Sequence, residues 1–113
     1  MRIRILTLTN LLMAGLLFAV TVLAEEITWI DVRTVDEFNQ AHLPGATNID
    51  HAQIGEDIGR LGLDKGAVIY LYCRSGYRAG IAKQTLESLG YTRVENIGGL
   101  NEALAKAQAL EQD

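Results

Sequence analysis

The stretch Val68-Ile69-Tyr70-Leu71-Tyr72-Cys73-Arg74-Ser75-Gly76-Tyr77-Arg78-Ala79 decides the fold of this chain. Its first five residues are all apolar or aromatic, which is typical of a central parallel strand that helices cover on both faces. After the segment 73–78, apolar residues recur at helical spacing between Ala82 and Leu89, and Gly90 is placed to end that helix. A buried strand that leads through a short loop into a helix indicates an α/β protein.

The segments on either side of this stretch also alternate between strand and helix patterns. Thr34 can cap a short helix at 35–41, with Glu37 in the third position to complete a capping box. The pair Gly98-Gly99 predicts a tight turn before a last helix. Such alternation predicts a parallel sheet with helices on its faces. The expected strands are 27–32, 46–49, 68–72 and 91–97, the other expected helices are 53–61 and 100–110, and the packed side of the last helix should carry Leu100, Leu104, Ala107 and Leu110.

The first 24 residues have the pattern of a secretory signal peptide. Arg2 and Arg4 give a positive start, the run 11–23 is apolar, and Val22-Leu23-Ala24 puts small side chains at the two positions that a signal peptidase reads. The core of the apolar run is shorter than the ~20 residues that a helix needs to cross a bilayer, which favours cleavage over retention as an anchor. We therefore expect a signal peptide at 1–24, a mature domain at 25–113, a periplasmic location, and contact with the membrane only before cleavage.

The charge of the chain argues against nucleic-acid binding. The formal net charge is −4, and removal of the leader takes away two arginines and no acidic residue, leaving 8 basic against 14 acidic residues and a net charge of −6. Such a surface repels phosphate backbones, and no basic stripe is present to override the repulsion. With 113 residues, the chain has room for one domain.

Cys73 is the one cysteine of the chain, so no internal disulfide can form. In an oxidising compartment a lone thiol is either an inert buried side chain or a reactive group. The surrounding loop favours the reactive interpretation. A helix start presents unpaired N–H groups and a partial positive charge, and Arg74 and Arg78 add two full charges. If Ser75-Gly76-Tyr77 curls round the sulfur, these groups form an anion-binding nest that favours the thiolate.

Four segments of the mature region carry a recognisable set of motifs. They are Cys73-Arg74-Ser75-Gly76-Tyr77-Arg78, Trp29-Ile30-Asp31-Val32-Arg33 with Glu37-Phe38, Ala41-His42-Leu43-Pro44-Gly45-Ala46-Thr47-Asn48-Ile49, and Asn96-Ile97-Gly98-Gly99. In order and spacing they resemble the rhodanese-type sulfurtransferases, in particular the exported single-domain form. The resemblance implies a rhodanese-like three-layer α/β fold, in which helices flank a small parallel sheet.

The resemblance also implies a reaction. The Cys73 thiolate would attack the outer sulfur of thiosulfate, release sulfite and carry the sulfur as a persulfide until cyanide or a thiol removes it. No metal or organic cofactor is needed for these steps, and a monomer is favoured. Cys73 would be catalytic, Arg78 would orient the donor, and Asp31 and Arg33 would be structural, as an ion pair or a turn-fixing contact. The other expected substrate-binding residues are Arg74, Ser75, Gly76 and Tyr77.

Two other functions stay open from the sequence. Cysteine phosphatases and arsenate reductases use a similar cradle, but their loops resemble C-x5-R, whereas Cys73 to Arg78 is C-x4-R, and the shorter ring suits a single sulfur atom better than a phosphate. A non-catalytic or persulfide-carrying module would instead deliver sulfur to a protein partner. His42 and His51 lie too far apart in sequence to form a local metal pair.

Overall fold

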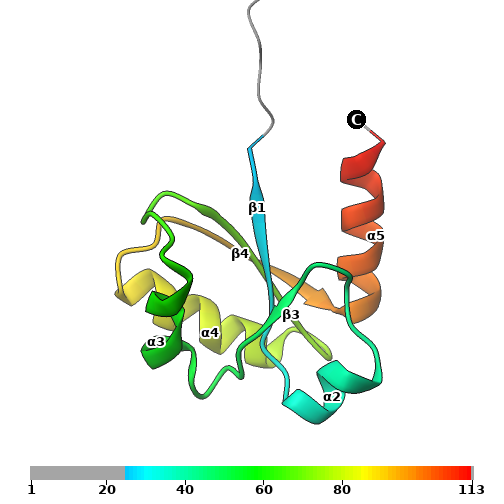
Figure 1. Ribbon diagram of the computed structural model, residues 1–113, viewed down its shortest axis with the longest axis horizontal. Helices are drawn as coiled ribbons and strands as arrows, with labels where there is room; N and C mark the ends of the chain where they lie inside the picture. The colour runs from blue at the N-terminus through cyan, green and yellow to red at the C-terminus, as the bar shows by residue number, and fades with distance from the viewer. Residues whose placement is uncertain (1–24, 113) are drawn as a thin grey trace, which may run out of the picture.

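All four strands of the sheet run parallel, in the order β2-β1-β3-β4 (Figure 1). The strands are β1 (Ile27–Asp31), β2 (Thr47–Asn48), β3 (Val68–Cys73) and β4 (Arg93–Gly99). The structure is a computed structural model that describes residues 25–112, so the predicted signal peptide lies outside the described residues. Within that range no helix is both long enough and apolar enough to span a membrane. The parallel sheet confirms the predicted α/β fold class.

β3 is the central strand, as its apolar sequence predicted. It pairs with β1 on one side and β4 on the other. Successive side chains of a strand point to opposite faces of the sheet. Ile69, Leu71 and Cys73 accordingly join one core cluster, whereas Tyr72 joins a second cluster on the opposite face. The strand therefore needs helices on both faces, and it ends with its cysteine on the face of the larger cluster.

One face of the sheet is covered by α3 (Ile54–Asp57), the 3-10 helix η2 (Ile58–Leu61) and α4 (Tyr77–Ser88) (Figure 1). The helix predicted at 53–61 is thus split into an α-helical and a 3-10 turn. α4 begins at Tyr77, inside the segment that the sequence assigned to the loop. The larger core cluster lies on this face, and each large apolar side chain buried there stabilises the fold by roughly 1.5–3 kcal/mol. Its fully buried members include Ile30, Ile54, Ile69, Leu71 and Leu86.

The other face is covered in part by α5 (Leu100–Glu111), which packs through its first turns (Figure 1). The predicted packed side of this helix was wrong in two positions, because Leu104 and Leu110 are 40% and 37% exposed. Ala103 is fully buried instead, with Leu100 and Ala107 partly buried around it. Leu104 follows Ala103 by one residue and therefore points about 100° away from it around the helix. Leu110, seven residues after Ala103, is on the same side but lies in the last turn, beyond the residues of α5 that pack on the sheet.

The last strand was also misplaced by sequence reasoning. β4 begins at Arg93 rather than at 91, because Gly90 (φ 102°) ends α4 and the Tyr91 N–H then donates to the Leu86 carbonyl. Gly98-Gly99, predicted as a tight turn, belongs to the strand instead. Just before these glycines the pairing with β3 skips Ile97, which is the signature of a β-bulge. The bulge bends β4 at its carboxyl end, beside the cysteine loop.

α2 (Val35–Gln40) lies between β1 and β2 and confirms the predicted capping box. The Thr34 hydroxyl accepts from the Glu37 N–H (3.2 Å), and the Glu37 carboxylate accepts from the Thr34 N–H (3.1 Å). Each bond satisfies a backbone donor that the first turn of a helix leaves unpaired. The box fixes where α2 begins, and with it the position of the Glu37 carboxylate.

Candidate active site

Cys73 is the last residue of β3, at the carboxyl end of the central strand. Its side chain is 1% exposed, and its sulfur accepts hydrogen bonds from the backbone N–H groups of Gly76 (3.0 Å) and Ala79 (3.4 Å). Hydrogen bonds that N–H groups donate to a sulfur favour its negatively charged form. The sulfur therefore sits against the apolar core on one side and in a small anion cradle on the other.

The loop turns at Gly76, whose φ of 103° lies in the left-handed region that favours glycine. Gly76 is the N-cap of α4, and its carbonyl accepts the first helical hydrogen bond from the Gly80 N–H (2.9 Å). The N–H groups before Gly80 have no partner within the helix, which leaves Ala79 free to donate to the sulfur. Sequence reasoning expected Ser75-Gly76-Tyr77 around the sulfur and missed Ala79. Two features of Ala79 could have indicated this role, namely its place as the third residue of the helix and its small side chain.

β4 supports the loop from the side. A Cβ at Gly99 would collide with the Arg74 backbone carbonyl, so the loop lies too close to the strand for any side chain at this position. The Asn96 side chain donates from Nδ2 to the Gly76 carbonyl (2.9 Å) and accepts from the Gly98 N–H through Oδ1 (3.0 Å). Sequence reasoning gave Asn96 no place in the site. An Asn two residues before a glycine is, however, a known signal of a side chain that hydrogen-bonds the following backbone.

Arg78 is paired with Glu37 of α2. Nη1 and Nη2 of Arg78 donate to the two carboxylate oxygens at 2.7 and 3.0 Å, and both side chains are 24% exposed. This bidentate hydrogen bonding lowers the pKa of Glu37 to about 2 and raises the pKa of Arg78. The Glu37 carboxylate also accepts from Thr34, so the first turns of α2 and α4 are tied together. Both outer nitrogens of Arg78 are thus engaged, and its role in orienting a donor stays a prediction.

The remaining loop side chains face outward. Arg74 and Ser75 are exposed, and Tyr77 is 77% exposed. A hollow of about 420 Å³ adjoins the loop, and it is lined by Gly76, Tyr77, Gly80, Ile81 and Gln84. Tyr77 therefore stands at the rim of this hollow, and its expected role in binding substrate stays a prediction. Among residues 25–112, Arg74 forms no ion pair, which leaves its charge available at the mouth of the loop.

Asp31 and Arg33 form a buried ion pair at the end of β1. Arg33 Nη2 lies 2.6 Å from Asp31 Oδ2, and the Arg33 N–H and Nε also donate to Asp31. This hydrogen bonding raises the pKa of Arg33. The guanidinium also donates to the Ala41 carbonyl (2.7 Å) and lies over the Tyr72 ring. Burial raises the pKa of Tyr72 to about 12. The ion pair thus joins β1 to the chain after α2, and the assignment of both residues to a structural role stays a prediction.

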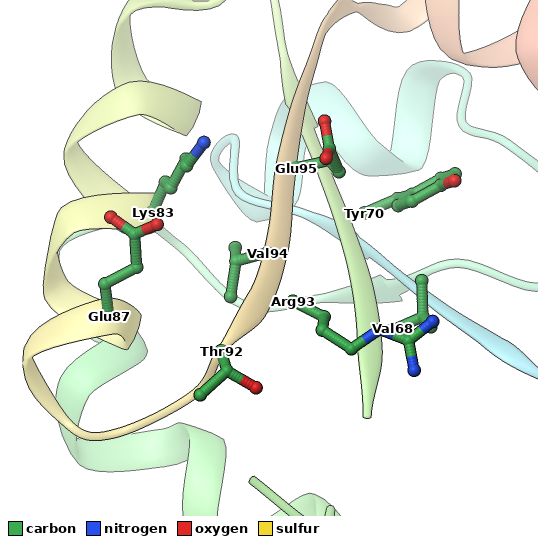
Figure 2. A pocket seen from close by; sticks show the side chains of 8 residues that line it. All are labelled: Val68, Tyr70, Lys83, Glu87, Thr92, Arg93, Val94 and Glu95. Atoms are coloured by element: carbon green, nitrogen blue, oxygen red, sulfur yellow. The ribbon is translucent and has the colours of Figure 1, made fainter. Parts of the chain in front are cut away.

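A second hollow, of about 390 Å³, lies at the other end of β4 (Figure 2). Figure 2 shows Lys83 and Glu87 of α4 on one side of the strand and Val68 and Tyr70 of β3 on the other. This hollow contains no residue of the cysteine loop, and its charges are of mixed sign. Within residues 25–112, no three His, Cys, Asp or Glu side chains gather in a way that could hold a metal ion.

Comparisons with known proteins converge on one family. The model of the rhodanese-like domain family matches residues 20–106. The thiosulfate sulfurtransferase PspE of Escherichia coli is 41% identical over 82% of this chain and 88% of its own length. The thiosulfate sulfurtransferase GlpE of Shewanella oneidensis is 28% identical over 76% of this chain and 83% of its own length.

A solved structure described as a rhodanese with anions from E. coli is similar to this fold. It has a TM-score of 0.65 and 40% sequence identity, and the match covers 68% of this chain and 91% of that chain. Sequence and structure comparisons therefore agree on the same family.

Proposed function

Because this chain belongs to the rhodanese-like domain family and its homologues mark it as a sulfurtransferase, we propose that it moves the outer sulfur of thiosulfate to an acceptor through a persulfide on Cys73. The single observation that carries the proposal is the position of the Cys73 sulfur. It accepts hydrogen bonds from the N–H groups of Gly76 and Ala79 at the start of α4. The names of two relatives support thiosulfate as the donor.

The first step forms a sulfur–sulfur bond on the enzyme. The Cys73 thiolate attacks the outer sulfur of thiosulfate, the bond inside thiosulfate breaks, and sulfite leaves with the bonding electron pair. One thiolate charge and two thiosulfate charges become one persulfide charge and two sulfite charges, so the charge balances. The donor carries two negative charges, and Arg74, which forms no ion pair among residues 25–112, would attract it to the loop.

The second step regenerates the thiolate. Cyanide attacks the outer sulfur of the persulfide, the sulfur–sulfur bond breaks, and its electron pair returns to Cys73 as thiocyanate leaves. A thiolate acceptor would react in the same way and leave as a persulfide. The two N–H groups at the cysteine would stabilise the anionic sulfur in both steps, as an oxyanion hole stabilises oxygen.

Replacement of the sulfur by oxygen tests the proposal. Cys73→Ser should keep the fold and lower thiocyanate formation from thiosulfate and cyanide to less than about one thousandth of the wild-type rate, because the serine hydroxyl cannot form a persulfide. Ser88→Cys in the Cys73→Ser background is the matched control, since it restores an exposed thiol outside the cradle and should restore no turnover. Retained turnover in Cys73→Ser would end the proposal.

A sulfur carrier that serves a protein partner is the second candidate, because the same cradle would hold a stored persulfide. Mass spectrometry of the wild-type protein after thiosulfate treatment distinguishes the two. An added sulfur atom that thiols remove, together with negligible turnover with cyanide, would favour the carrier. Rapid turnover with cyanide favours the enzyme.

Export to the periplasm through residues 1–24 also belongs to this proposal, and it rests on the sequence pattern alone. Expression of the full chain in a Gram-negative host should give a periplasmic protein whose measured mass is that of a chain beginning at Glu25. A membrane-bound protein that keeps its first residues would show that the segment is an anchor.

A further inference from the structure

The Asn96 side chain links two backbone segments that meet beside the cysteine. Its Nδ2 donates to the Gly76 carbonyl at 2.9 Å, and its Oδ1 accepts from the Gly98 N–H at 3.0 Å. A carbonyl needs a donor and an N–H needs an acceptor, so the two partners allow the amide one orientation. Asn96 therefore acts as a bracket between the bulge of β4 and the loop.

Gly76 is the residue that most needs such a bracket. Its N–H is the closer of the two donors to the Cys73 sulfur. Because glycine has no side chain, little else restricts the backbone rotation at this residue, whose φ is 103°. Its carbonyl is held twice, by the Asn96 amide and by the Gly80 N–H. Fixing the carbonyl of a residue limits the rotation of its own N–H. The Asn96 amide also lies close to Gly76 and Gly80, and its Nδ2 is 3.5 Å from where a Cβ of Gly80 would stand.

We propose that Asn96 is a positioning residue for the sulfur cradle, which acts by holding Gly76 so that its N–H stays directed at the Cys73 sulfur. The inference rests on the proposed function of Cys73 as the nucleophile. The hydrogen bonds of Asn96 go to Gly76 and Gly98 and not to the Cys73 sulfur, and this role needs no contact with the donor. Its loss should weaken stabilisation of the sulfur anion and leave the binding of thiosulfate unchanged.

Two substitutions of Asn96 and one control separate this role from simple support of the fold. Asn96→Ala removes both hydrogen bonds. Asn96→Asp keeps the shape and an oxygen for the Gly98 N–H, but its ionised carboxylate cannot donate to the Gly76 carbonyl. Asn101→Ala, on the exposed side of α5, is the matched control. Asn96→Ala adds and removes no charge. Arg74 stays in place, as does Arg78 with the carboxylates of Glu37 and Asp50 that interact with it. The Glu102 carboxylate, which accepts from the Gly99 N–H, is also unchanged.

Three measurements are made on each full-length variant. The rate of Cys73 alkylation by iodoacetamide is followed against pH, turnover is followed with thiosulfate and cyanide, and thermal unfolding is recorded. Direct loss of one oxyanion-hole donor costs about 10²–10³ in kcat, so loss of its support should cost roughly tenfold. We expect kcat to fall by that factor in both Asn96 variants, the KM for thiosulfate to stay within twofold, and the alkylation midpoint to move to higher pH. Asn101→Ala should match the wild type.

The inference is overturned if the folded Asn96→Ala variant has the wild-type alkylation midpoint and kcat, whatever its melting temperature. If Asn96→Ala does not fold, the same comparison is made on Asn96→Leu, which keeps the approximate size of the side chain, adds no charge and forms neither hydrogen bond. The two proposals fail separately. A wild type that does not turn over thiosulfate refutes the donor, yet a shifted alkylation midpoint in the variants would still support the role of Asn96.

Discussion

Two glycines shape the sulfur cradle for different physical reasons. Gly76 is needed for its backbone conformation, because φ is 103° at the turn that leads into α4. Gly99 has an ordinary φ of −104° and is needed for space, because any side chain would meet the Arg74 carbonyl and the Glu102 carboxylate. The Gly99 N–H donates to that same carboxylate at 2.9 Å. The absence of a Cβ atom at Gly76 and Gly99 therefore allows the loop to take its position.

Gly99→Ala should destabilise the protein by about 1–3 kcal/mol, the usual cost of forcing an extra carbon into a packed site. It should also lower turnover, because the Arg74 carbonyl must move and the cysteine is its neighbour in sequence. Urea unfolding and the thiosulfate assay measure both effects. Gly66→Ala is the control, since a Cβ there meets nothing within 4 Å. Equal stability of the two variants would show that the contact at Gly99 relaxes freely.

At the scale of elements, α2 shows how a short helix is held in place. It has six residues and no buried ones, and helices of this length are marginal on their own. The capping box fixes its first turn, and the ion pair from Glu37 to Arg78 attaches that turn to α4. The cap therefore serves two elements, because it orients the carboxylate that Arg78 binds.

Thr34→Ala should cost about 1 kcal/mol of stability, since it removes the side-chain cap of the Glu37 N–H. Thr34→Ser keeps the hydroxyl and should stay close to the wild type, which makes it the matched control. Thermal or urea unfolding of the two variants gives the comparison. If both lose the same stability, the threonine methyl group matters and the cap does not.

At the scale of the whole molecule, the ion pair that joins α2 to α4 makes stability depend on acid. The pKa of Glu37 is about 2 in the folded state against an ordinary value of 4.5, because Arg78 hydrogen-bonds its ionised form. The folded state therefore binds fewer protons than the unfolded state between these values, and acid favours unfolding. The stabilisation is fully present above about pH 4.5 and is lost as the pH falls toward about 2.

We expect the free energy of unfolding to fall over this range in the wild type and to fall less steeply in Glu37→Gln, which has no proton to bind. Urea unfolding at several pH values between 5 and 2 is the measurement. Glu111→Gln, at the exposed end of α5, is the control and should follow the wild type. Identical slopes in wild type and Glu37→Gln would show that the ion pair adds no net stability.

The order of elements could be predicted from the sequence because local patterns specify it. The apolar run of β3, the Thr34–Glu37 capping box and the spacing from Ala82 each depend on residues close together in the chain. The errors came where packing decides. Ala103 rather than Leu104 faces the sheet, because the side of a helix that packs depends on the residues of the sheet as well as on those of the helix. Gly98-Gly99 continues β4 after a bulge at Ile97 rather than forming a turn, since pairing with β3 sets the register.

The sequence by itself determined that a lone cysteine would stand between a buried strand and a glycine turn at the start of a helix. Residues within a few positions of each other create that arrangement. Only the tertiary structure decided what surrounds the loop: Glu37, 41 positions away, engages Arg78, and Asn96, 20 positions away, holds Gly76. Contacts across such separations depend on how the sheet brings its strand ends together, and no local pattern encodes that geometry.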